Sequence, residues 1–107
     1  METKFAVIFT SQLHTADEAA YAIAAQRMIE LAKGQDGFLG VDSVQNTTSL
    51  GITVSYWSSI KAIQQWKTNA EHFAVQKLGK QKWYQSFNIK ICRIERETEF
   101  TGKAPHG

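Results

Sequence analysis

The sequence predicts an α+β fold in which one four-stranded antiparallel sheet carries helices on a single face. Two kinds of hydrophobic spacing alternate along the chain. Four short runs rich in β-branched and aromatic residues are typical of strands, and two segments with apolar residues every three or four positions are typical of amphipathic helices. Their order is strand, helix, strand, strand, helix, strand, which is that of a ferredoxin-like sandwich.

A single domain accounts for nearly the whole chain. It has 107 residues, 43% of them apolar, which suffices for one core. We expect this domain to cover residues 1–100 and residues 101–107 to form a flexible tail with nothing to bury. No apolar run approaches the roughly 20 residues that span a bilayer, and the N-terminus lacks a signal-peptide pattern. These features favour a cytoplasmic protein without a membrane partner.

The charge is unevenly distributed. Residues 61–96 contain eight basic and two acidic side chains, whereas residues 1–60 contain three basic and six acidic ones. Clustered cations attract anions, including nucleic acids. The lysines are, however, spread around predicted helices, and no nucleic-acid-binding motif accompanies them. We therefore expect a solvated surface and no nucleic-acid partner.

Local signals define the first strand and the first helix. The segment 4–11 is β-branched and aromatic, with apolar residues on both faces. Thr15 and Glu18 have the spacing of a capping box, which predicts a helix from that point to about Lys33. Gly34 then supplies a C-terminal stop.

The middle of the chain predicts a hairpin followed by helix. Residues 37–46 and 50–57 are strand-like runs joined by a short polar connection, so we expect them to pair in antiparallel fashion. The serine pair at 58–59 offers a hydroxyl cap for the next helix. A second capping box, from Thr68 to Glu71, predicts either two short helices in tandem or one bent helix.

The last strand is predicted over residues 86–100. Its apolar residues alternate through Phe87, Ile89 and Ile91 and then change parity to Cys92 and Ile94, which indicates a β-bulge. Because Cys92 lies within this alternation and not beside a histidine, we expect it to be a core residue and not a reactive thiol.

Helices on one side leave the other face of the sheet uncovered. The third strand carries Ile52, Val54 and Tyr56 on one face, opposite Thr53, Ser55 and Trp57 on the other. No further element is left to cover the second apolar face. We therefore expect a second copy of the chain to do so, giving an obligate homodimer with sheet against sheet.

Three quoted stretches carry a resemblance to a known family. They are DGFLGVDSVQN, ITVSYWSSIKAIQQW and AEHFAVQKLGKQKWYQSFNIKICRIER, within a match from about Lys4 to Glu99. The pattern resembles the antibiotic biosynthesis monooxygenase family of dimeric α+β barrels. That resemblance implies an oxidoreductase, since the family includes cofactor-independent oxygenases of aromatic polyketides and quinols, together with haem-degrading enzymes.

The haem-degrading branch is only partly matched. Trp66 corresponds to a tryptophan which that branch uses, but Gln76 stands where its iron-ligating histidine would be. Thr10 and Ser11 stand where it has an asparagine. Because glutamine is a poor substitute for imidazole on haem iron, the sequence disfavours haem, and we expect no cofactor.

The candidate site lies on one stripe of the helical segment. Helical spacing places His72, Gln76, Gly79 and Trp83 on one face, with Tyr84 beside them. We predict His72 as the catalytic base because its pKa lies near neutrality, and Gln76 as the amide that orients a carbonyl. A purely structural role for His72, in which its ring bonds to a backbone carbonyl, remains the competing interpretation.

Aromatic residues complete the predicted site. Trp66 is the second catalytic candidate, and the residues predicted to bind substrate are Gln76, Trp83, Tyr84, Trp57 and Tyr56. Trp57 and Trp66 are also natural core residues, because large apolar side chains are most often buried. No pair of His, Cys or carboxylate residues has metal-ligand spacing on a common face, so we expect no metal site.

Three functional hypotheses follow. The first is a cofactor-independent monooxygenase acting on a small aromatic or quinol-type molecule. The second is a non-catalytic module that binds a small molecule in the same pocket, favoured by the missing asparagine on the first strand. The third is a module that binds haem without degrading it, with lysines holding the propionates.

Overall fold

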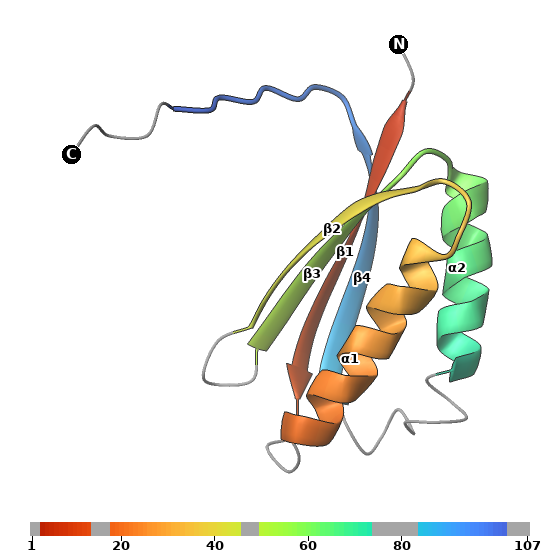
Figure 1. Cartoon of the computed structure of the whole chain (residues 1–107), viewed down its shortest axis with the longest axis vertical. Helices are drawn as coiled ribbons and strands as arrows, with labels where there is room; N and C mark the ends of the chain where they lie inside the picture. The colour runs from red at the N-terminus through yellow and green to blue at the C-terminus, as the bar shows by residue number, and fades with distance from the viewer. Residues whose placement is uncertain (1–2, 14–17, 46–49, 74–83, 103–107) are drawn as a thin grey trace.

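A computed structural model of the chain describes residues 3–13, 18–45, 50–73 and 84–102 (Figure 1). The order of the helices and strands along the chain confirms the α+β prediction. Their bounds are β1 Lys4–Leu13, α1 Glu18–Lys33, β2 Phe38–Gln45, β3 Leu50–Trp57, α2 Ile60–Phe73 and β4 Tyr84–Ile94.

The four strands form one antiparallel sheet in the order β2-β3-β1-β4. Both helices lie on the same face of this sheet (Figure 1). The predicted hairpin of the second and third strands is confirmed by the pairing of β2 with β3. The result is the predicted ferredoxin-like arrangement, in which one sheet face is covered by helices.

The strand register assigns each residue to one of two faces. On β1 and β3, the pairs Phe5↔Trp57, Val7↔Ser55 and Phe9↔Thr53 lie on the helix side, which we call the covered face. The intervening pairs Ala6↔Tyr56, Ile8↔Val54 and Thr10↔Ile52 lie on the other side, which we call the open face. Successive residues of a strand point to opposite faces, so neighbours in sequence meet different surroundings.

The buried core lies between the covered face and the helices. Its members come from β1, β3 and both helices: Val7, Ala32, Trp57, Ala62 and Ile63. Two of the three helical members are alanines, whose small side chains allow the helix backbones to approach the large indole of Trp57. Phe5, Phe38, Trp66 and Ile89 pack around this cluster. No helix in the described ranges is long and apolar enough to cross a membrane.

The helix boundaries follow the predicted signals where the structure describes them. The backbone N–H of Ala62 donates to Ser59 Oγ at 3.1 Å, so Ser59 is the N-cap of α2. At the end of α1, the N–H of Gly34 donates to the carbonyl oxygen of Glu30 at 3.2 Å. The capping box that begins at Thr15 lies partly outside the described residues.

Of the two alternatives predicted from the second capping box, the two short helices divided at Thr68 are wrong. α2 runs without a break from Ile60 to Phe73 through the predicted boundary at Thr68. The hydroxyl of Thr68 donates to the carbonyl oxygen of Gln64 at 3.0 Å, four residues earlier. A threonine within a helix can bond backward in this way as readily as it can cap a new helix, and the spacing alone does not separate the two.

The predicted β-bulge in the last strand is also wrong. β4 pairs with β1 in continuous register from Ile94 to Ser86, and the register shifts only between Gln12 and Leu13 of β1. The change of parity has another cause: Ile91, opposite Val7, lies on the covered face, whereas Cys92, opposite Ala6, lies on the open face. Cys92 is only half-buried there and is not part of the buried core.

The chain beyond Ile94 does not continue the strand. Residues 95–102 are exposed and form neither helix nor strand, and Figure 1 shows them running away from the sheet. Lys4 Nζ lies 3.3 Å from Glu97 Oε2, but this pair is exposed and therefore holds the segment only weakly. The strand prediction was too long because its last residues are charged and have no apolar face to bury. Of the predicted tail, residues 103–107 lie outside the described residues.

Candidate functional site

Three aromatic side chains meet where α2 crosses the covered face. Phe38 of β2 contacts Trp57 edge-on, with ring centroids 5.5 Å apart at an interplanar angle of 77°. Trp66 of α2 contacts the same indole, with centroids 5.5 Å apart and an angle of 38°. We call Phe38, Trp57 and Trp66 the aromatic cluster. Such tilted and edge-to-face contacts add to the stabilisation from burial itself.

Trp57 is the fixed centre of the cluster. Its side chain is 0% exposed, and its Nε1–H donates to Ser55 Oγ at 2.9 Å. The two residues are neighbours on the covered face because they are two positions apart on β3. In this chain the fully buried indole of Trp57 supports Trp66 from behind, and its contact with substrate stays a prediction.

Trp66 differs from Trp57 in one chemically important respect. Its ring is only partly buried, yet its Nε1 is shielded from solvent and has no acceptor among the described residues. A buried N–H without an acceptor costs about 1–3 kcal/mol. Buried polar groups are almost always paired in native proteins, so an orphaned donor of this kind needs an explanation. A ligand oxygen placed against Trp66 would satisfy it.

Hydroxyl groups lie on the same face of the sheet. Ser11 is 2% exposed and Ser55 is 5% exposed, and both are on the covered face. The position opposite Ser11 is Gly51, where an added Cβ would come within 3.5 Å of Ser11 Oγ. The covered face thus carries the aromatic rings and Ser55 toward the Trp57 end of the sheet and the buried hydroxyl of Ser11 toward the other end.

The strand register also separates Thr10 and Ser11, which stand where the sequence analysis placed the asparagine of the haem-degrading branch. Ser11 is on the covered face, on the same side of the sheet as Trp66, whereas Thr10 is on the open face. Ser11 is nevertheless far from the aromatic cluster, because it lies six positions along β1 from Phe5, the residue opposite Trp57, which is roughly 20 Å. Its single hydroxyl offers fewer hydrogen bonds than a carboxamide would.

The predicted helical stripe is mostly outside the described part of the chain. His72 lies in the last turn of α2, but its side chain is outside the described residues. Gln76, Gly79 and Trp83 fall outside them entirely. Tyr84 is the first residue of β4 and pairs with Leu13, and its side chain is not described. The roles assigned to these residues remain predictions.

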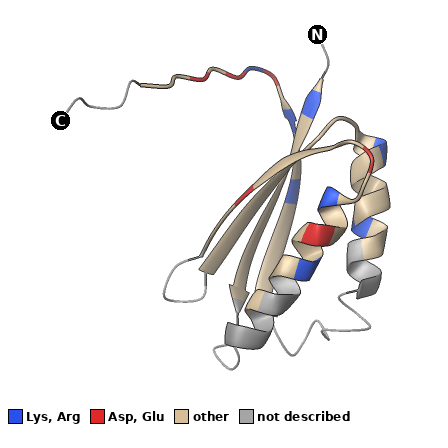
Figure 2. Ribbon diagram, in the orientation of Figure 1, with Lys and Arg blue, Asp and Glu red and all other residues tan. Residues whose placement is uncertain are grey.

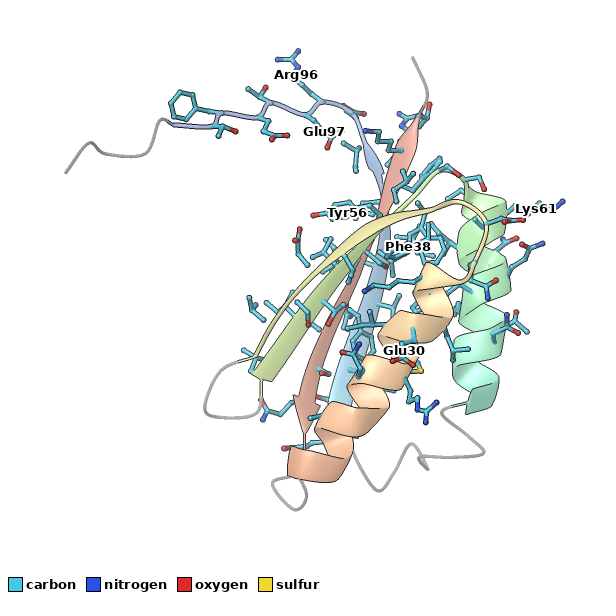
Figure 3. The ribbon with its side chains drawn as sticks, viewed as in Figure 1. Glu30, Phe38, Tyr56, Lys61, Arg96 and Glu97 are labelled. Carbon is cyan, nitrogen blue, oxygen red and sulfur yellow. The ribbon has the colours of Figure 1, made fainter. Side chains whose placement is uncertain are left out.

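Tyr56 faces away from the aromatic cluster. Figure 3 shows its side chain directed away from the two helices, and its hydroxyl donates to Asp42 Oδ2 at 3.0 Å across the open face. That hydrogen bond raises the pKa of Tyr56, with smaller contributions from burial and from the negative charges of Asp42 and Glu97. The structure therefore separates Tyr56 from Trp57 and Trp66, with which it was grouped as a substrate-binding residue.

Two members of the site were not predicted. Ser55 and Phe38 both contact Trp57, one as hydrogen-bond acceptor and one through its ring. The alternation of β3 places Ser55 beside Trp57, so that neighbour could have been found from the sequence. Phe38 could not, because its contact depends on a shift in the register between β2 and β3 near Gly40. The described ranges contain no group of three or more His, Cys, Asp or Glu side chains that could hold a metal ion.

Comparison with known proteins places these observations in a family context. The chain matches the antibiotic biosynthesis monooxygenase family over residues 4–78. It is 41% identical over 96 residues to the uncharacterized protein YqjZ of Bacillus subtilis, with 90% of this chain and 83% of that protein covered.

Solved structures with the same fold are more distant in sequence. SnoaB of Streptomyces nogalater, a cofactor-independent oxygenase, superposes with a TM-score of 0.73 at 11% identity, covering 90% of this chain and 96% of that one. Protein SO0527 of Shewanella oneidensis superposes with a TM-score of 0.74 at 10% identity, covering 88% and 93%. At these identities the similarity establishes the fold alone.

Proposed function

Since the chain belongs to the antibiotic biosynthesis monooxygenase family, we propose that it is a cofactor-independent monooxygenase acting on a small aromatic, quinol-type molecule. The observation that carries the proposal is the orphaned indole N–H of Trp66. Trp66 belongs to the aromatic cluster, which packs on the sheet face that also holds buried hydroxyls. The description of SnoaB as a cofactor-independent oxygenase supports the same chemistry on this fold.

The proposed role of Trp66 is to bind an oxygen atom of the substrate. When a phenol or quinol loses a proton, negative charge develops on its oxygen and the conjugated ring carbons. A donor that is already desolvated and oriented stabilises this charge more than water does, because it needs no reorganisation during the reaction. The exposed part of the indole would stack on the substrate ring.

The reaction requires a base and a dry environment. His72, as predicted, would remove the proton, and the resulting anion would then pass an electron to dioxygen. For a ring methylene activated by neighbouring phenol rings, one oxygen atom ends in the new carbonyl group and the other leaves as water. The substrate supplies all the electrons, so no metal or flavin is needed. Gln76, Trp83 and Tyr84 would orient the ring.

Replacing Trp66 with phenylalanine tests the role of the indole N–H. The variant keeps an aromatic ring against Trp57 but removes the donor. We expect the enzymic rate of oxygen uptake with an anthrone or a naphthohydroquinone to fall by roughly 100-fold. Tyr56→Phe is the matched control, since it removes a hydroxyl from the opposite face and should leave the rate unchanged. Equal rates in parent and Trp66→Phe would contradict the proposed role.

The second candidate function is a binding module with the same site and no turnover. The observation that favours it is Ser11, which has less hydrogen-bonding capacity than the asparagine of the haem-degrading branch. If the protein is a binding module, the parent protein binds the naphthohydroquinone but consumes no oxygen above the spontaneous rate. Quenching of tryptophan fluorescence measures the binding. Trp66→Phe would then weaken binding. Turnover by the parent would exclude this alternative.

The oligomeric state and the cellular location are also part of the proposed function. We propose a homodimer in the cytoplasm, which the single cysteine and the apolar open face support. Light scattering at micromolar concentration tests the oligomeric state, since a particle of the monomer mass of 12.0 kDa would contradict a dimer.

A further inference from the structure

Apolar side chains remain exposed on the covered face along β4. Phe87 is 43% exposed and Ile91 is 45% exposed, although the register with β1 places both on the helix side of the sheet. Ile89 lies between them on the same face, and Phe87 contacts the ring of Phe9, with centroids 5.8 Å apart. We call Phe9, Phe87, Ile89 and Ile91 the apolar strip. A contiguous exposed apolar surface usually marks an interaction or ligand-binding site.

The apolar strip is continuous with the aromatic cluster. Trp66 and Ile89 both pack against the buried core, whose member Val7 is directly opposite Ile91 in the register. The helix that carries Trp66, α2, connects β3 to β4, and β1 lies between these two strands, so α2 crosses over β1 toward the strip. A ligand held at Trp66 can therefore extend directly onto β4.

The two halves of the covered face differ in polarity. Ser43 of β2 and Thr53 of β3 lie in the same row as Phe9 of β1 and Ile89 of β4, so this row is polar on one half and apolar on the other. All four side chains of the apolar strip are hydrocarbons. Figure 2 shows β4 tan except at its basic positions, of which Lys90, within the length of the strip, belongs to the open face.

The composition of the apolar strip determines which chemical group it accepts. The additional rings of a fused aromatic polyketide carry hydroxyl or carbonyl groups, and each would lose its hydration against hydrocarbon without gaining a hydrogen bond. An aliphatic chain has no such groups and gains about fourfold in affinity for each methylene that it buries. From Ile91 to Phe87 the strip spans four steps of a strand, about 13 Å, which matches a chain of about ten carbons.

We propose that the substrate is a quinol with an aliphatic chain, alkyl or isoprenoid. One ring oxygen accepts the indole N–H of Trp66, and the chain lies on the apolar strip along β4. Because β4 is an edge strand, a longer chain can pass the edge of the sheet without crossing another strand. The inference rests on the proposed function, since it specifies the substituent of the quinol that Trp66 binds.

Binding of two quinols that differ only in chain length tests the inference. The probes are methylnaphthohydroquinone and decylnaphthohydroquinone, kept under nitrogen so that neither is oxidised and used below the concentrations at which they form micelles. Quenching of tryptophan fluorescence gives the dissociation constants. We expect the decyl compound to bind the parent protein about 100-fold more tightly, because one side of its chain is buried on the strip.

Variants of the strip locate the chain. Ile91→Thr and Phe87→Thr remove hydrocarbon surface but introduce a residue that favours a strand. Each should reduce the difference in affinity between the two compounds by about tenfold and leave the affinity for the methyl compound unchanged. Val44→Thr is the matched control, because Val44 is an exposed aliphatic residue on the other edge strand and on the open face, and it should change neither affinity. Circular dichroism of each variant shows whether the fold is retained.

Each contrary outcome bears on a different statement. Equal affinities of the parent for the two compounds overturn the aliphatic chain but leave the proposed function, which oxygen uptake with the methyl compound tests separately. A difference that persists in both Ile91→Thr and Phe87→Thr overturns the strip as the site of the chain. If these variants instead weaken self-association in sedimentation and leave the difference intact, the strip contacts a second copy, which also overturns the inference. A parent that binds neither compound overturns the inference and the proposed function together.

Discussion

The covered face and the open face belong to the same strands but differ in what surrounds their side chains. On the covered face, Val7 is 2% exposed and Trp57 is 0% exposed, because two helices pack over them. On the open face, the neighbouring residues Ile52 and Val44 keep 37% and 68% of their surface exposed. The two faces therefore have different roles: the covered face stabilises the protomer, whereas the open face is available for association.

The largest expected difference between the faces is in the free energy of unfolding. Trp57→Ala empties the centre of the core and should lower it by about 3–5 kcal/mol in urea denaturation. Ile52→Ala removes only partly exposed surface, so its main effect should be a weaker dimer, visible as a dependence on protein concentration. Similar losses for the two variants, independent of concentration, would contradict the division between stability and association.

Two glycines, one next to the core and one on the open face, give a second comparison of the two sides of the sheet. Gly37 has φ +88°, and an added Cβ would lie 2.7 Å from the Cβ of Ala62 in the core. Gly37→Ala should therefore cost about 2–4 kcal/mol through backbone strain and overpacking. On the open face, a Cβ at Gly40 would meet only the Tyr56 ring, at 3.8 Å. Gly40→Ala should be neutral or stabilising by up to about 1 kcal/mol, because glycine weakens a strand. Thermal unfolding of both variants compares them directly.

Hydroxyl groups provide a smaller contrast between buried and exposed positions. Ser55→Ala leaves the buried Nε1–H of Trp57 without its acceptor and should lower the free energy of unfolding by about 1–3 kcal/mol. Ser43 also bonds through its hydroxyl, to Thr53 at 2.8 Å, but that pair is exposed. Ser43→Ala should change stability by less than about 0.5 kcal/mol. Denaturant titrations in which the two serines have equal effects would argue against a special role for the buried bond.

The smallest expected effect concerns Tyr56 at high pH. Its pKa is raised in the folded protein, so the neutral phenol is the stabilising form. This contribution is complete below about pH 10, the usual value for tyrosine, and is lost as the pH rises through the folded-state pKa. In an ultraviolet titration we expect one late tyrosine that is absent in Tyr56→Phe and that shifts to lower pH in Asp42→Ala. A parent whose tyrosines all titrate normally would contradict the hydrogen bond to Asp42.

Most of the fold could be predicted from local patterns. The alternation of β1, the pairing of β2 with β3 and the Ser59 cap depend on residues close in sequence, and the structure confirms all three. The capping box at Thr68 failed because the same residue types serve a helix interior as well as a helix start. The bulge in β4 failed because a change of apolar parity can also mean that both faces of a strand are apolar.

Less of the candidate site than of the fold could be predicted from the sequence. Trp66 was identified through a family resemblance, but its orphaned N–H and its contact with Trp57 depend on how α2 crosses the sheet. The alternation of the third strand predicts that Tyr56 and Trp57 lie on opposite faces, and the register confirms it, so the two do not face one site from the same side of the sheet. The complete burial of Trp57 could not be predicted from the sequence either, because it depends on Ala32 and Ile63, which come from two different helices.

The sequence by itself determined the order of the strands and helices and which residues of each strand share a face, because both follow from local propensity and from the two-residue period of a strand. Only the tertiary structure decided which of the two faces is covered and which buried donor has no acceptor within the described ranges. Those properties depend on packing between segments far apart in the chain, such as α2 against β3, and no local pattern encodes where such segments meet.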